Sequence, residues 1–228
     1  MTEHNPLDIY FDSAYLGDPA VEYVTWLDIM GSTNQMLRSL PIAANFIMKL
    51  HCAVLESHDE LPSDEQVKIR LYPVMDGVYI TSRRRFPLHH LLNQAMARVV
   101  ATFLEEEKPF HQFLVRGAVA FGPIYHGRDL DARTAHVLTD HPAVRDSILL
   151  GLPMAQAYGA EREAPPFGIA ADASARAFSP DGDDPLRFVW LDWFKYVEPR
   201  VNVELLVDRL NVYFDWQKRH CNMTGYRL

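Results

Sequence analysis

The order in which strand-type and helix-type patterns follow one another is the feature that most limits how this chain can fold. Apolar, β-branched runs indicate strands, and apolar residues at helical spacing indicate helices. The predicted strands are 21–29, 67–74, 78–81 and 114–121, and the predicted helices are 42–56 and 88–107. Read in sequence, this is the β-α-β-β-α-β order of a ferredoxin-like core. We therefore expect an α/β (α+β) fold with a ferredoxin-like βαββαβ core and C-terminal strand and helix additions.

Turn signals and the weaker C-terminal patterns complete this prediction. Asp76-Gly77 is a typical hairpin turn, and Gly122-Pro123 predicts a tight turn followed by a second short strand up to residue 127. The polar stretch 128–146 predicts a loop. Beyond it we expect a helix over 152–162, a strand over 167–171 with Asp172 as the next N-cap, and a helix over 202–220. In that last helix Leu205, Leu206, Leu210 and Phe214 are expected on one buried face.

Composition indicates one folded, soluble domain. The 228 residues are 48% hydrophobic, enough for a sizeable core, and we expect an N-terminal extension (1–19) before a single domain (20–228). The net charge of −8 argues against a general nucleic-acid-binding protein. There is no signal-peptide pattern and no run apolar enough to span a bilayer, so a cytoplasmic location without membrane association is expected.

The two cysteines, Cys52 and Cys221, do not have the spacing of a metal site. Two free thiols in a reducing compartment are expected, and one disulfide stays open as an alternative. Neither a P-loop nor a Gly-x-Ser-x-Gly elbow occurs in the sequence, which disfavours the enzyme classes built on them.

Two aspartates, Asp28 and Asp76, each follow an apolar strand-like run. A carboxylate at the end of a buried strand is costly unless something offsets its desolvation. Two of them on adjacent strands could share one or two divalent cations, the usual means of handling a nucleoside triphosphate. The alternative is that Asp28 is a helix N-cap and Asp76 only a turn residue.

Three motifs in order make the chain resemble a known family. They are Asp-Ile-Met-Gly at 28–31, Met-Asp-Gly-Val-Tyr-Ile at 75–80 and Arg-Gly-Ala-Val-Ala-Phe-Gly at 116–122. Together they resemble the class III nucleotide cyclases over residues 20–172, and most closely the bacterial Pycsar pyrimidine cyclases, which make cyclic UMP or cyclic CMP in anti-phage defence. The resemblance implies an enzyme that converts UTP to 3′,5′-cyclic UMP and pyrophosphate. A cytidylate cyclase and a non-catalytic nucleotide-binding homologue remain alternatives.

The resemblance also implies roles for individual residues. Asp28 and Asp76 would ligate two Mg²⁺ or Mn²⁺ ions with the carbonyl of Ile29, and the Met30-Gly31-Ser32 backbone would cradle phosphates. Tyr72 stands where purine cyclases carry an adenine-selecting lysine, and Ile148 falls near the position of their second determinant, an aspartate. Both departures favour a pyrimidine, with Tyr72 and its strand neighbour Arg70 as substrate contacts. Tyr72 as an ordinary strand aromatic is the alternative.

One departure from the family pattern bears on catalysis. The asparagine and arginine that orient the ribose and stabilise the transition state are replaced by Ala155 and Gly159. The candidate replacement cations are Arg70, Arg116, Arg162 and Lys195. The resemblance further implies a homodimer with its sites at the interface, and a cyclic product that acts on a separate effector.

Overall fold

The computed structural model describes residues 11–131, 133–180, 183–197 and 201–220. Within these ranges the centre of the fold is a mixed sheet in the order β2-β3-β1-β4-β5, with β6 pairing beside β4. The strands are β1 (Ala20–Ile29), β2 (Ile69–Val74), β3 (Gly77–Ser82), β4 (Val115–His126), β5 (Leu149–Leu150) and β6 (Ile169–Ala171). All pairings are antiparallel except that of β6 with β4. The expected βαββαβ core and its α+β class are confirmed.

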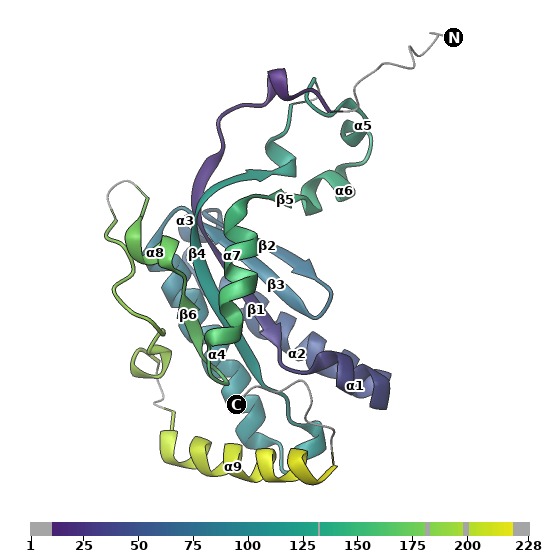
Figure 1. Cartoon of the computed structure of the whole chain (residues 1–228), viewed down its shortest axis with the longest axis vertical. Helices are drawn as coiled ribbons and strands as arrows, with labels where there is room; N and C mark the ends of the chain where they lie inside the picture. Colours follow the sequence, from purple (N-terminus) through teal and green to yellow (C-terminus); the bar gives the residue numbers. More distant parts are fainter. Residues whose placement is uncertain (1–10, 132, 181–182, 198–200, 221–228) are drawn as a thin grey trace.

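Helices connect and cover these strands (Figure 1). They are α1 (Ser32–Arg38), α2 (Leu40–Asp59), α3 (Ser63–Gln66), α4 (Arg85–Glu105), α5 (His136–Thr139), α6 (Pro142–Ser147), α7 (Leu152–Ala160), α8 (Ala173–Ala177) and α9 (Val203–His220). Short 3-10 segments lie at Ser13–Tyr15, Pro109–His111, Gly127–Asp129, Glu161–Glu163 and Trp193–Lys195. The strand that begins at Ala20 and the helices α2, α4 and α7 agree with their predicted ranges to within a few residues.

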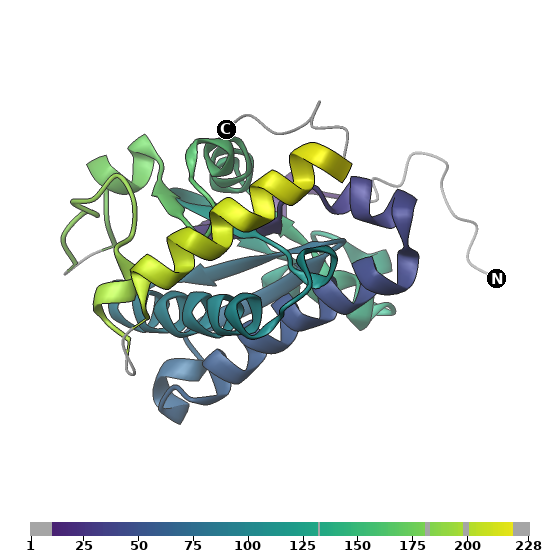
Figure 2. The same cartoon turned by 90° about the horizontal axis from the view of Figure 1, so that it is seen from below.

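Alternation along the strands places different residues on the two faces of the sheet. Tyr23 and Leu27 of β1 belong to a large buried cluster with residues of α2 and α4, such as Phe46 and Leu91. Figure 2 shows these two helices on one side of the sheet and α7 on the other. On the α7 side, Trp26 packs in a smaller buried cluster with Val24, Tyr72, Tyr79 and Ala157 of α7. Asp28, two residues beyond Trp26, therefore lies on the α7 side.

The structure corrects three sequence expectations. First, β4 continues through Gly122-Pro123 without a turn, and Pro123 stands opposite Val21. This position lies between the parts of β4 that pair with β6 and with β5, so the missing N–H of proline interrupts neither ladder. The predicted tight turn was wrong because Gly-Pro is only a local signal, whereas pairing with β1 is a tertiary constraint.

Second, the expected loop over 128–146 contains the short helices α5 and α6. Each has too few turns for an amphipathic period to appear in the sequence. Third, Leu205 of α9 is exposed, and Tyr213 rather than Leu205 is buried with Leu206. The buried face predicted for α9 is therefore slightly rotated from the face that the structure buries.

None of the described helices is long and apolar enough to cross a bilayer. Cys52 is a free, exposed cysteine, and Cys221 lies outside the described residues.

Candidate active site

Strand register brings the two aspartates to one corner of the sheet. Asp28 pairs with Gly77 of β3, and Asp76 directly precedes Gly77 in the β2–β3 turn. Figure 1 shows this hairpin on the same side of the molecule as α1, which follows β1. Burial, and then the negative charges of Asp76 and Glu161, raise the pKa of Asp28 to about 7. Like charges gathered in a partly buried corner favour the protonated form of Asp28.

Gly77 sets how closely β3 approaches β1 at this corner. A Cβ added to Gly77 would lie 2.4 Å from Cη2 of Trp26 and 2.5 Å from the backbone oxygen of Leu27. The second contact is with backbone and has no rotamer to relieve it. Glycine therefore holds the turn that carries Asp76 against the end of β1.

The segment after β1 turns sharply at Gly31, whose φ of 73° lies in the left-handed region that glycine tolerates best. This turn leads into α1, and its first residue, Ser32, donates a hydrogen bond from Oγ to Oδ2 of Asp76. Met30 is buried and donates its backbone N–H to the oxygen of Leu114 at 2.9 Å. The 30–32 segment is thus fixed beside both aspartates.

Arg116 and Glu161 complete the charged corner. Arg116 of β4 is the register partner of Asp28 on the side away from β3, and its positive charge opposes the rise of the Asp28 pKa. Its Nε also forms an ion pair with the buried carboxylate of Glu161, just after α7. Sequence reasoning named Arg116 only as one of four cations and missed Glu161, because neither its spacing nor its surroundings in the chain distinguish it from a helix-end glutamate.

The predicted base-contact residues lie further along the same face. Tyr72 is buried, and its hydroxyl is 2.6 Å from Nδ1 of His126. The other ring nitrogen of His126 lies 3.3 Å from Oε1 of Glu22. Leu149, next to Ile148, packs in the same cluster as Tyr72, so these two segments do meet. Sequence reasoning did not foresee His126 or Glu22 behind Tyr72.

The remaining candidate cations have partners elsewhere. Arg70 forms an ion pair with Asp129 at 2.7 Å and also interacts with Tyr72, its neighbour on β2. Arg162 lies over the ring of Tyr158, and exposed Lys195 pairs with Asp192 at 2.5 Å. Ala155 and Gly159 lie on α7, where an added Cβ on Gly159 would meet nothing within 4 Å. Arg116 is therefore the candidate whose charge acts directly on Asp28.

The fit of a divalent cation to this corner can be judged from the donor groups. Among the described residues, no group of three or more His, Cys, Asp or Glu side chains is arranged to hold a metal ion. Two carboxylates, Asp28 and Asp76, do converge, and their mutual repulsion is what a cation would relieve. Hard oxygen donors of this kind suit Mg²⁺ or Mn²⁺ when substrate phosphates and water supply the other ligands.

Comparison with known proteins gives remote structural similarities. No protein-family model matches the chain, and no curated protein matches it significantly. An adenylate cyclase from Trypanosoma brucei, described as monomeric, is 13% identical with a TM-score of 0.48, covering 73% of this chain and 79% of the other. The guanylyl cyclase domain of the RhoGC fusion protein from Blastocladiella emersonii, also monomeric, is 13% identical with a TM-score of 0.45, covering 69% and 82%. Such low values leave the function to be argued from the residues of the site.

Proposed function

We propose that the protein is a nucleotide cyclase that converts a nucleoside triphosphate, preferentially UTP, to the 3′,5′-cyclic monophosphate and pyrophosphate. The observation that carries this proposal is the convergence of Asp28 and Asp76, with the pKa of Asp28 raised to about 7 by burial and by the neighbouring carboxylates. A corner built this way is destabilising by itself and becomes favourable when cations occupy it.

In the proposed reaction the ribose 3′ oxygen attacks the α-phosphorus. The bond from that phosphorus to the bridging oxygen of the β-phosphate breaks, pyrophosphate leaves, and the hydroxyl proton passes to water. Bound Mg²⁺ or Mn²⁺ would lower the pKa of the hydroxyl and neutralise charge on the leaving group. Asp28, Asp76 and the Ile29 carbonyl are the groups that would hold the ions.

Neighbouring residues have supporting roles in this proposal. The Ser32 hydroxyl donates to Asp76 and so orients its carboxylate. Of the predicted phosphate cradle, Gly31 and Ser32 would offer their N–H groups to phosphate oxygens, because the N–H of Met30 is already bonded to Leu114. Arg116 takes the place of the missing transition-state cation: it lies opposite Asp28 and exchanges part of its pairing with Glu161 for a phosphate when substrate binds.

Pyrimidine preference is the finer part of the proposal. By the resemblance, Tyr72 and the Ile148 position replace the charged groups expected for adenine, and the absence of those groups is what favours a pyrimidine. Tyr72 is buried against His126, with the charge of Arg70 nearby. UTP is the preferred substrate and CTP the second. By the resemblance noted from the sequence, the product would be a messenger for a separate effector in anti-phage defence in the cytoplasm.

The direct test is to incubate the purified protein with ATP, GTP, CTP and UTP in separate reactions with Mn²⁺ and to identify the products by mass. Cyclic UMP is expected, with its rate falling at least about 100-fold in Asp28→Asn and in Asp76→Asn, as is typical for loss of a central electrostatic group. Asp59→Asn, at the exposed end of α2, is the matched control and should keep the wild-type rate.

Different outcomes separate the parts of the proposal. Cyclic AMP or cyclic GMP as the main product would refute the pyrimidine preference and leave the metal corner intact. Nucleotide binding without turnover would favour the non-catalytic homologue, which the missing residues at Ala155 and Gly159 also favour. Activity that survives both aspartate substitutions would refute the proposed site.

A further inference from the structure

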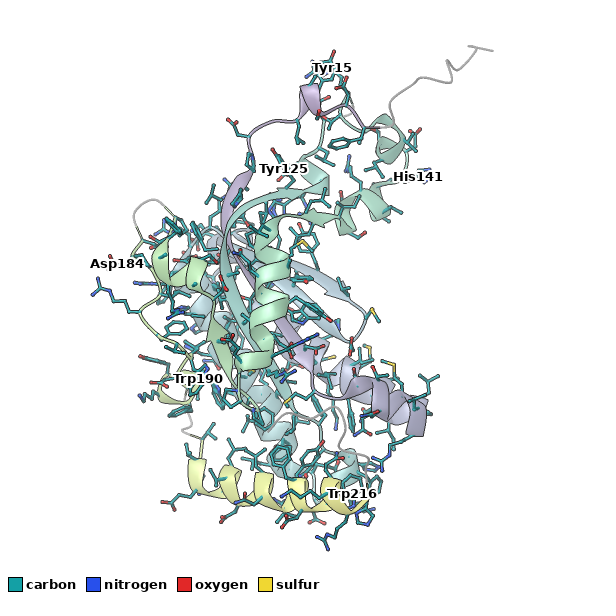
Figure 3. All side chains as sticks on the ribbon, in the orientation of Figure 1. Tyr15, Tyr125, His141, Asp184, Trp190 and Trp216 are labelled. Carbon is teal, nitrogen blue, oxygen red and sulfur yellow. The ribbon has the colours of Figure 1, made fainter. Side chains whose placement is uncertain are left out.

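A second hollow lies on a different part of the molecule from the aspartate corner. It has a volume of about 500 Å³ and lies between the first turns of α4 and the connection from α8 to α9. Figure 3 labels Trp190 and Asp184 of this connection, both on the flank opposite α1 and the β2–β3 hairpin. None of its lining residues belongs to the corner of Asp28 and Asp76.

The sides of this hollow are aromatic and unusually open to solvent. Phe86 is 76% exposed, Trp190 52% and Tyr196 67%, and all three line the same space. Phe188, also in the lining, packs against the ring of His89 with centroids 5.5 Å apart. Large rings gathered around a concavity and left exposed mark a binding site more often than a random surface.

The base of the hollow contains polar atoms that lack partners. Asn93 is only 8% exposed, and its Oδ1 has no hydrogen-bond partner within the described part of the chain. Nε2 of His89, one turn earlier on α4, also has no hydrogen-bond partner within the described part of the chain. Burial, and then the charge of Arg85, lower the pKa of His89 to about 4, so its ring is neutral near pH 7. A buried acceptor without a donor is costly, and a ligand N–H would satisfy it.

The aromatic wall is held in place by its backbone. The N–H of Ala171 donates to the oxygen of Val189 at 2.8 Å, and the N–H of Leu191 donates to the oxygen of Ile169 at 2.9 Å. Trp190, between these two anchors, is thereby attached to β6. A site formed before binding loses less entropy when a ligand enters.

Charge at the rim narrows the choice of ligand. Arg85 lines the hollow, and its Nη1 donates to the backbone oxygen of Asp184 at 3.2 Å. The one carboxylate in the lining, Asp192, is already paired with Lys195. The carboxylate of Asp183 also accepts from the N–H of Arg85 at 2.9 Å and acts on His89, so the charges at the rim largely balance. Such a rim suits a neutral ring, with Arg85 within reach of an anionic group.

We propose that this pocket binds a planar nitrogen heteroaromatic ring of the nucleobase type. The ring would stack among Trp190, Phe86 and Tyr196 and donate an N–H to Oδ1 of Asn93. Stacking tolerates any base, whereas the acceptor selects a ring that carries a donor on its edge. A free nucleoside and a nucleotide share this chemistry, and in a nucleotide the phosphate would extend toward Arg85.

The test measures binding by calorimetry, with EDTA present so that no divalent cation supports binding at the aspartate corner. Uridine, cytidine, adenosine and guanosine are titrated separately, followed by their 5′-monophosphates. At least one is expected to bind with a dissociation constant between about 10 μM and 1 mM. Asn93→Leu and Trp190→Ala should each weaken this binding by about tenfold or more. If either variant fails to fold, Phe86→Ala serves as a second probe of the aromatic wall.

Phe110→Ala removes an exposed aromatic outside the pocket and should leave binding unchanged, as should Asp28→Asn. Arg85→Gln distinguishes a nucleotide from a free nucleoside as the ligand, because it should weaken the binding of monophosphates and leave the binding of nucleosides unchanged. Absence of binding up to about 1 mM for the whole panel would overturn the proposal. So would binding that Asn93→Leu and Phe86→Ala both leave unchanged. Neither result depends on whether the protein is a cyclase.

Discussion

Asp28 combines two properties that a folded protein rarely tolerates together. It is partly buried, and it shares its corner with the carboxylates of Asp76 and Glu161. Arg116 compensates only in part because Glu161 also pairs with it. This unfavourable arrangement is the residue-scale observation on which the proposed cation site rests.

The electrostatic cost of ionising Asp28 predicts a specific pH dependence of stability. The folded-state pKa of Asp28, about 7, lies above its ordinary value of 3.8, so the folded protein binds the proton more tightly than the unfolded chain. Stability contributed by this group is therefore lost as the pH rises from about 4 to about 7 and stays lost above it. Asp28→Asn removes the titration and should stabilise the metal-free protein at pH 8 by roughly 2 kcal/mol relative to wild type.

Urea unfolding in EDTA at pH 4.5 and at pH 8 checks this expectation. The difference in unfolding free energy between Asp28→Asn and wild type should be larger at pH 8. Adding Mn²⁺ at pH 8 should stabilise wild type and not the variant. Equal differences at the two pH values would contradict the placement of Asp28 in a charged, partly buried corner.

At the scale of elements, the site depends on how tightly β3 is drawn against β1. Gly77 lies against Trp26 and the backbone of Leu27, and it directly follows Asp76. In contrast, Gly159 on α7 is exposed with open space around its Cβ position. The two glycines therefore form a matched pair.

Gly77→Ala should destabilise the fold by about 2 kcal/mol, because the added methyl group meets backbone that cannot rotate away. It should also lower cyclase activity, since the turn carrying Asp76 must shift. Gly159→Ala, in the last turn of α7, should stabilise the protein by roughly 0.5 kcal/mol, somewhat less than the usual gain in a helix interior. Chemical unfolding of both variants gives the comparison, and a neutral Gly77→Ala would show that the strand spacing is not fixed by this contact.

At the scale of the whole molecule, the corner of Asp28 and Asp76 is bordered by exposed apolar side chains. Met75, in the same turn as Asp76, is 84% exposed, and Tyr158 of α7, whose ring contacts Trp26, is also exposed. Exposed apolar groups beside a polar site are typical of an interface. The homodimer that the family resemblance implies would cover these side chains, and the prediction below tests it.

Met75→Glu should weaken the proposed dimer by about tenfold or more, and activity per subunit should fall with it at low protein concentration. Val207→Glu, at an exposed position of α9, is the control and should change neither dimer affinity nor activity. Sedimentation velocity together with rate measurements over a dilution series tests the link. Full activity in a monomer would contradict a site that is shared between subunits.

Much of this architecture is visible in the sequence because it is encoded locally. Apolar periodicity predicted the strands and long helices of the βαββαβ core, and the Asp-Gly signal predicted the hairpin at Gly77. The N-cap at Asp172 is confirmed by its hydrogen bond from the N–H of Ser174 at 2.8 Å. Failures occurred where a local signal was overruled, as at Gly122-Pro123, where pairing with β1 keeps the strand continuous.

By itself the sequence determined the order of the elements and the placement of two aspartates at strand ends, since both depend on short stretches of chain. Only the tertiary structure decided which distant groups join them. Register put Arg116 opposite Asp28, the end of α7 brought Glu161 to Arg116, and β4 placed His126 against Tyr72. These choices depend on strand register and helix docking, where a shift of one residue exchanges one face of a strand for the other, and no local pattern records that alignment.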